Sequence, residues 1–181
     1  SPHLVAAIGN PDWQPLLLVT SGLAVLGAAV IVFVPDGPFA AASPPLDLRY
    51  ALTIMRNRPL RLANIGYFGH MWELYAVWAW LPVYLAASMG AGRGTSLLAF
   101  VAIGVAGLVG SLGAGALADR IGRTAVTSVA MGISGAAAAL SAVAFGAPEI
   151  AVAALAIIWG VAVIADSAQF STAASELCDS R

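Results

Sequence analysis

The feature that most constrains this chain is a series of five apolar segments, each long enough to cross a membrane. A helix needs about 20 predominantly apolar residues to span the roughly 30 Å hydrocarbon core of a bilayer. The segments are residues 15–34, 62–87, 95–118, 124–147 and 150–170. Backbone groups in lipid must be satisfied within the segment, so each is expected to be a helix. The sequence therefore predicts an all-α membrane protein with five transmembrane helices.

The composition agrees with lipid as the main solvent. Of the 181 residues, 60% are hydrophobic and 9% are charged, compared with about 45–50% apolar and about 25% charged in soluble domains. The net charge is -1 and no basic cluster occurs, so nucleic acid is not expected as a partner. The single cysteine excludes an intrachain disulfide and a thiolate cluster. No metal or cofactor is predicted.

The arginines lie almost entirely on one side of the predicted spans. Residues 35–61 hold four of them, the turn after the third span holds two, and Arg181 closes the chain, whereas only Arg93 falls on the other side. By the positive-inside rule the arginine-rich side is cytoplasmic. We expect the N-terminus outside and the C-terminus in the cytoplasm of a cell membrane, such as a bacterial inner membrane. The arginines on the cytoplasmic side are Arg49, Arg56, Arg58, Arg61, Arg120, Arg123 and Arg181.

A charged loop between the third and fourth spans has the pattern G-x-x-x-D-R-x-G-R, formed by Gly115, Asp119, Arg120, Gly122 and Arg123. The first glycine would allow close approach of a neighbouring helix, and the second allows positive φ in a tight turn. The arginines can meet lipid phosphate or carboxylates. The aspartate follows a helix, whose dipole disfavours an anion at that end. One of the two arginines, or the N-terminus of another helix, is therefore expected to hold it.

This loop resembles the cytoplasmic signature loop of the major facilitator superfamily, although Thr124 stands where the family usually has a basic residue. Residues 9–13 and 69–73 add to the resemblance. It implies that the chain forms helices six to ten of a twelve-helix transporter. Residues 1–34 would then be the last helix of the N-terminal half, 35–61 the central cytoplasmic linker, and 62–181 the first four helices of the C-terminal half.

The resemblance also implies that Gly115, Asp119, Arg120, Gly122 and Arg123 act as a conformational switch. The remaining helices of the same transporter would be partners, and the chain would not transport alone. A plain positive-inside turn is the alternative interpretation of the loop.

The second span carries a polar and aromatic face. A carboxylate at the centre of a spanning helix costs about 2.5–3.5 kcal/mol on insertion scales, so Glu73 is a functional candidate. Histidine ordinarily titrates near neutral pH, which suits proton coupling at His70. At 100° per residue, one sector of about 80° contains Gly66, His70, Glu73, Val77, Trp80 and Tyr84.

In the family that the chain resembles, the first helix of each three-helix repeat lines the central cavity. Here these helices are residues 62–87 and 150–170. Glu73, His70, Trp80, Tyr84 and Asp166 are therefore candidates for a proton-coupling site or a substrate cavity. Three alternatives stay open. Glu73 and His70 satisfy one another or partners on the remaining helices of the transporter, the aromatic residues only pack, or Asp166 marks the cytoplasmic end of its span and reaches the interface.

The functional prediction is secondary active transport of a small solute, coupled to protons, by alternating access, as a symporter or an antiporter. An enzyme is the weaker hypothesis. The sequence Gly132-Ile-Ser134-Gly135 resembles rhomboid proteases, but those need a histidine on a later helix, and both histidines lie upstream. A non-transporting assembly subunit, or a truncated remnant, is the second alternative.

Overall fold

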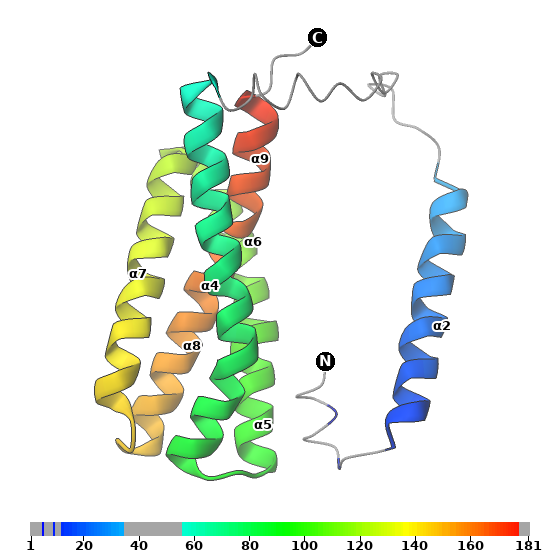
Figure 1. The fold of residues 1–181 in the computed structure, drawn as a ribbon, viewed down its shortest axis with the longest axis vertical. Coiled ribbons are helices and arrows are strands. Elements are labelled where there is room, and N and C mark those ends of the chain that lie inside the picture. Colours follow the sequence, from blue (N-terminus) through cyan, green and yellow to red (C-terminus); the bar gives the residue numbers. More distant parts are fainter. Residues whose placement is uncertain (1–4, 6–8, 10–11, 35–55, 178–181) are drawn as a thin grey trace.

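The computed structural model describes residues 5, 9, 12–34 and 56–177, and the regular elements among them are all helices (Figure 1). The predicted linker lies mostly at residues 35–55, outside the described residues. The elements are α2 (Trp13–Val32), α4 (Arg58–Met89), α5 (Arg93–Phe100), η1 (Val101–Ala106), α6 (Gly107–Ile121), α7 (Arg123–Ala144), α8 (Glu149–Ala165) and α9 (Ser167–Leu177).

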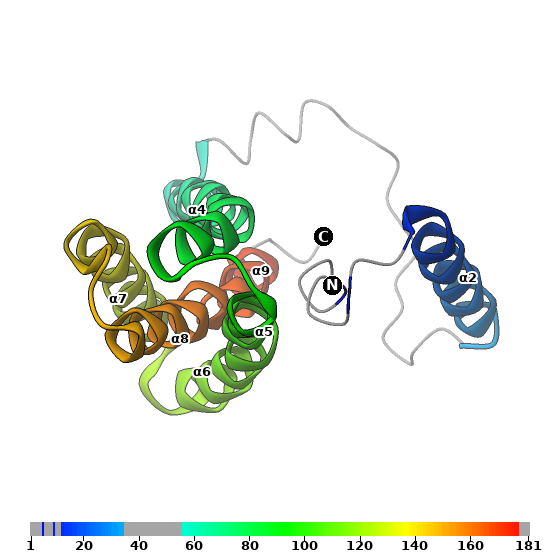
Figure 2. The same ribbon diagram turned by 90° about the horizontal axis from the view of Figure 1, so that it is seen from below.

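Helix α2 stands to one side of the other helices (Figures 1 and 2). None of its residues is buried, and its side chains are apolar on all faces. A helix that is apolar all round requires an apolar environment on every side. Lipid and further protein can both provide it.

Helix α4 is longer than predicted at both ends. Residues 62–87 were expected, whereas the helix starts at Arg58, so Arg58 and Arg61 belong to it and not to the linker. The reason is local: the side chain of Asn57 accepts a hydrogen bond from the backbone N–H of Leu60 at 3.4 Å, and Pro59 occupies the first turn. Asparagine before a helix and proline in its first turn are both typical start signals.

The third predicted span is one continuous rod built from α5, η1 and α6, which extends from Arg93 to Ile121. Its middle part, η1, is a π-helix, a wider turn with i→i+5 hydrogen bonds that is rare and often lies at functional sites. The rod ends at Gly122, whose φ is +90°. The predicted role of this glycine in a tight turn is confirmed.

Helix α8 is the centre of the bundle formed by α4 to α9, since it packs against α4, η1, α6 and α7 (Figure 2). Its axis is broken at Asp166, and α9 continues from Ser167. The main core forms where α4, α5, η1 and α8 meet. Its buried leucine and valine members are Leu74, Val77, Leu81, Leu85, Val152 and Val163.

Three glycines allow α8 to pack closely against its neighbours. A Cβ added to Gly110 would overlap the backbone of Val161, and one added to Gly160 would overlap the backbone of Ala102. A Cβ added to Gly107 would overlap the side chain of Ile164. Small residues at these crossings are what close packing of membrane helices requires.

Four helical segments of the described part are long and apolar enough to cross a membrane: Trp13–Val32, Arg93–Ile121, Arg123–Ala144 and Glu149–Leu177. Helix α4 is not among them, although its 32 residues would extend about 48 Å at 1.5 Å per residue. Polar side chains such as Asn64, His70 and Glu73 reduce its apolar character. Helix α4 nevertheless packs against α5, α8 and α9. Its polar groups are therefore candidates for function, because polar groups inside a membrane protein are costly.

Candidate functional site

A histidine and an aspartate meet in the interior, between the middle of α4 and the break between α8 and α9. The Nδ1 atom of His70 lies 2.9 Å from Oδ1 of Asp166, and the two side chains are only 1% and 2% exposed. The contact is at ion-pair distance, but the ring N–H is not aligned for a hydrogen bond. Neither ring nitrogen of His70, nor this oxygen, has a hydrogen bond within the described part of the chain.

Two aromatic rings lie against the imidazole of this His70–Asp166 pair. The ring of Tyr67 stacks at 6.2 Å from the imidazole, and the ring of Phe170 lies 5.6 Å from it. A Cβ on Gly66 would come within 2.8 Å of the Phe170 ring, so this glycine makes room for it. Little water reaches the pair, and a dry environment strengthens the interaction between charges.

The break in the last helix places Asp166 against α4. Asp166 ends α8 with φ of -91° and ψ of -11°. Its carbonyl oxygen then accepts the N–H groups of Gln169 and Phe170 at 3.0 and 3.1 Å. The last span was predicted at residues 150–170, and one alternative placed Asp166 at the interface. That alternative is wrong, because α9 extends the helical segment to Leu177 and the carboxylate is buried.

Glu73 has a different partner from His70. The hydroxyl of Ser134 on α7 donates a hydrogen bond to Oε1 of Glu73. Ser134 is buried, and Glu73 is partly buried. The two ionisable groups of α4 therefore do not satisfy one another. The serine of the G-x-S-G sequence is a hydrogen-bond donor to a carboxylate.

A cavity of about 380 Å³ lies beside Glu73, between α4, α7 and α8. Trp80 and Tyr84 line it, together with Trp159 of α8. The Tyr84 hydroxyl donates a hydrogen bond to the backbone oxygen of Ser141 at 2.8 Å, which orients the ring. The structure thus brings Glu73, Trp80 and Tyr84 to one cavity. It places His70 and Asp166 in a separate buried pair.

The charged loop between α6 and α7 is held by its last arginine. Arg123 forms a bidentate ion pair with Glu176 of α9, with N–O distances from 2.8 to 3.1 Å, and also donates to Oε1 of Gln169 at 3.1 Å. Asp119 and Arg120 are exposed, and neither has a hydrogen bond or ion pair to another described residue. Asp119 therefore forms no hydrogen bond or ion pair with an arginine of the described part, and its interaction with Arg123 is a longer-range attraction between opposite charges.

The close helix approach that was expected at Gly115 does not occur within the described part of the chain. A Cβ added there would meet no atom within 4 Å among the described residues. The glycines that permit close approach lie further along the same rod, at Gly107 and Gly110. Their spacing of three residues places both on the face towards α8.

Comparison with known protein families matches residues 1–181 to the family described as Major Facilitator Superfamily. The chain belongs to the major facilitator superfamily. No curated protein and no solved structure matches it. Membership makes the protein an integral membrane transporter of the major facilitator type. Its environment is the lipid bilayer and its substrate a small solute, and members of this superfamily are in general transporters and not enzymes.

Glu176, the partner of Arg123, is among the site residues that were not predicted from the sequence. Glu176 lies beyond the predicted end of the last span, and the residues before it, Ser-Thr-Ala-Ala-Ser, are too polar and small to indicate a continuing membrane helix. The sequence does contain hydroxyl residues that could have indicated a continuing helix. Ser171, Thr172 and Ser175 each donate to the carbonyl oxygen four residues earlier, a bond that lets such residues stay helical in apolar surroundings.

The Arg123–Glu176 pair should contribute only slightly to stability. Glu176 is 56% exposed, and exposed ion pairs are weak and screened by salt. We expect Arg123→Gln to lower the melting temperature of the protein in detergent slightly at low salt, with a smaller difference at high salt. Arg120→Gln is the matched control, since it removes a neighbouring arginine without that pair. An equal shift at both salt concentrations would show that Arg123 acts through packing.

Proposed function

We propose that this major facilitator protein is a secondary active transporter of a small solute, that it works by alternating access, and that protons drive it. The observation that carries the proposal is the buried His70–Asp166 pair. Ionisable residues are expensive inside a membrane and are retained there mainly for function. A pair that joins α4 to the break between α8 and α9 can respond to a proton by changing how these helices are held.

The electrostatics of the pair support a proton-dependent change. With Asp166 ionised and His70 protonated, the charges attract across 2.9 Å in surroundings that screen them weakly. A proton on the carboxylate removes its charge and with it this attraction. The contact between α4 and α9 then becomes weaker, which suits a step between two arrangements of the bundle.

The substrate site in this proposal is the cavity beside Glu73. Its volume of about 380 Å³ falls within the range of about 300–1,000 Å³ for small-molecule pockets. No basic side chain lines it, whereas Glu73 contributes a carboxylate. This lining suits a neutral or cationic group of the solute, with Trp80 and Tyr84 as its aromatic walls.

The orientation and domain organisation remain part of the proposal. The arginine distribution supports an outside N-terminus and a cytoplasmic C-terminus in a cell membrane, such as a bacterial inner membrane. Residues 1–34 would close the N-terminal half, 35–61 would link the halves, and 62–181 would begin the C-terminal half. The loop from Gly115 to Arg123 would act as a cytoplasmic latch, with Arg123 binding Glu176 in the arrangement described here.

The test is proton movement in proteoliposomes that contain the complete protein. With an imposed pH gradient and an internal pH-sensitive dye, a panel of neutral and cationic solutes should reveal at least one that triggers proton flux. We expect Glu73→Gln to abolish this flux while the protein still inserts, because the variant loses the carboxylate and keeps the shape of the side chain.

Glu149→Gln is the control, since this carboxylate lies exposed in the first turn of α8. Unchanged flux in Glu73→Gln would remove Glu73 from the mechanism. No flux with any solute in the wild-type protein would favour a non-transporting assembly role.

A further inference from the structure

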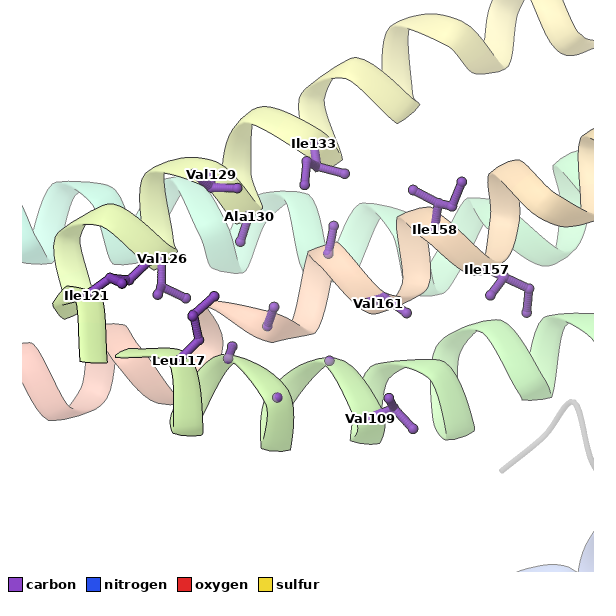
Figure 3. Close-up of a pocket in the computed structure, with 15 residues that line it drawn as sticks. Val109, Leu117, Ile121, Val126, Val129, Ala130, Ile133, Ile157, Ile158 and Val161 are labelled. Carbon is purple, nitrogen blue, oxygen red and sulfur yellow. The ribbon is translucent and has the colours of Figure 1, made fainter. Parts of the chain in front are cut away.

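A groove of about 520 Å³ runs between α6 and α7, with α8 as its floor (Figure 3). All the residues that line it are apolar. Its walls are exposed, with Val109 at 61% and Val129 at 59%, whereas small residues such as Gly110 and Ala162 form its base. No side chain that lines it offers a hydrogen bond, so the groove suits a hydrocarbon.

The length of the groove matches one leaflet of a bilayer. Its α6 wall extends from Val109 to Ile121, about 18 Å at 1.5 Å per residue. Half of a hydrocarbon core of about 30 Å is about 15 Å.

A cation stands at the cytoplasmic end of the groove. Arg120 lies seven residues, or about two turns, beyond Gly113, which lines the groove, so both are on the same face of α6. Helical side chains lean towards the N-terminus of their helix, which for Arg120 is the direction of the groove. It is exposed and has no bonded partner among the described residues. The neighbouring Asp119 faces a separate hollow with Arg123 and Glu176.

We propose that this groove binds an anionic phospholipid of the cytoplasmic leaflet, with one acyl chain between α6 and α7 and its phosphate at Arg120. Apolar lining, leaflet length and a cation at the headgroup level each match one part of such a lipid. The cytoplasmic leaflet is also where anionic lipids attract basic side chains. The site lies apart from the cavity beside Glu73, so the inference rests on the proposed orientation but not on the proposed transport mechanism.

The test is native mass spectrometry of the complete protein, incubated with equal amounts of phosphatidylglycerol and phosphatidylcholine. We expect one retained lipid, with phosphatidylglycerol preferred about fivefold, the effect of one basic residue near an anionic surface. Arg120→Gln should remove the preference while lipid is still retained. Gly113→Leu should reduce retention of both lipids to background, because its side chain fills the groove. A Cβ at Gly113 meets no described atom within 4 Å, so the protein should still fold.

Gly135→Leu is the matched control. It lies nine residues from Val126, on the opposite side of α7 from the groove, and a Cβ there is equally free. Leu117→Trp, at the headgroup end of the groove, fills it independently if Gly113→Leu does not insert. If Gly113→Leu and Leu117→Trp both retained as much lipid as the wild type, the lipid site would be overturned. A wild-type protein that appeared as a dimer without bound lipid would also overturn it. A preference for phosphatidylglycerol that survives Arg120→Gln would overturn the headgroup assignment.

Discussion

Replacing Asp166 by leucine is expected to lower the free energy of unfolding by about 3–5 kcal/mol, the usual cost of removing one partner from a buried ion pair. His70 would remain in the interior, 1% exposed, without the carboxylate that compensates it. Titration with SDS in mixed micelles, followed by circular dichroism, measures the change. The matched control is Asp119→Leu, which removes an exposed carboxylate near the end of α6 and should change stability much less.

The double variant His70→Leu with Asp166→Leu provides the decisive comparison. Apolar residues of similar volume often replace both partners of a buried pair without loss of stability. We therefore expect the double variant to be more stable than Asp166→Leu alone, and the two changes to be strongly non-additive. Additive losses would mean that the two side chains act separately and that the 2.9 Å contact has no energetic role.

Gly160→Ala is expected to lower the free energy of unfolding by about 1–3 kcal/mol, the range for overpacking of a close-packed interior. The added methyl group would overlap the backbone of Ala102 in η1. A backbone cannot rotate away as a side chain can, so α8 and η1 must separate. Gly110→Ala should behave alike, because its methyl group would overlap the backbone of Val161. The same SDS titration measures both variants.

The control for these glycine variants is Gly113→Ala on the same rod. The added methyl group meets no described atom within 4 Å. Alanine is a better helix former than glycine by about 1 kcal/mol, so this variant should be as stable as the wild type or more so. If all three variants lost stability equally, helix propensity and not helix contact would explain the glycines.

The existence of the helices could be predicted from the sequence because it depends on local properties. A long apolar segment in lipid must satisfy its backbone hydrogen bonds internally, so it forms a helix. The turn at Gly122 requires a residue that tolerates positive φ. The helix ends were less predictable. Asn57 and Pro59 signal the start of α4, but the arginines around them favoured a linker. The polar residues before Glu176 concealed the continuation into α9.

The pairing of the site residues could not be predicted, because it depends on packing between distant segments. The helical wheel placed Glu73, Trp80 and Tyr84 on one face of the helix, and in the structure all three line one cavity. It could not show that His70 lies against Asp166, since a wheel describes one helix and not its neighbours. Likewise, of the glycines along the third span, only the tertiary contacts distinguish Gly110, which faces α8, from Gly113, which does not.

The π-helix η1 implies a particular pattern of evolutionary insertion. Its turn contains one more residue than an α-helical turn, so a relative with an ordinary helix here would align with a one-residue gap within Val101–Ala106. Deleting one residue would also turn the Arg93–Phe100 part about 100° relative to Gly107 and Gly110. An alignment of this segment should therefore place length changes at η1 and leave the register of the glycines beyond it unchanged.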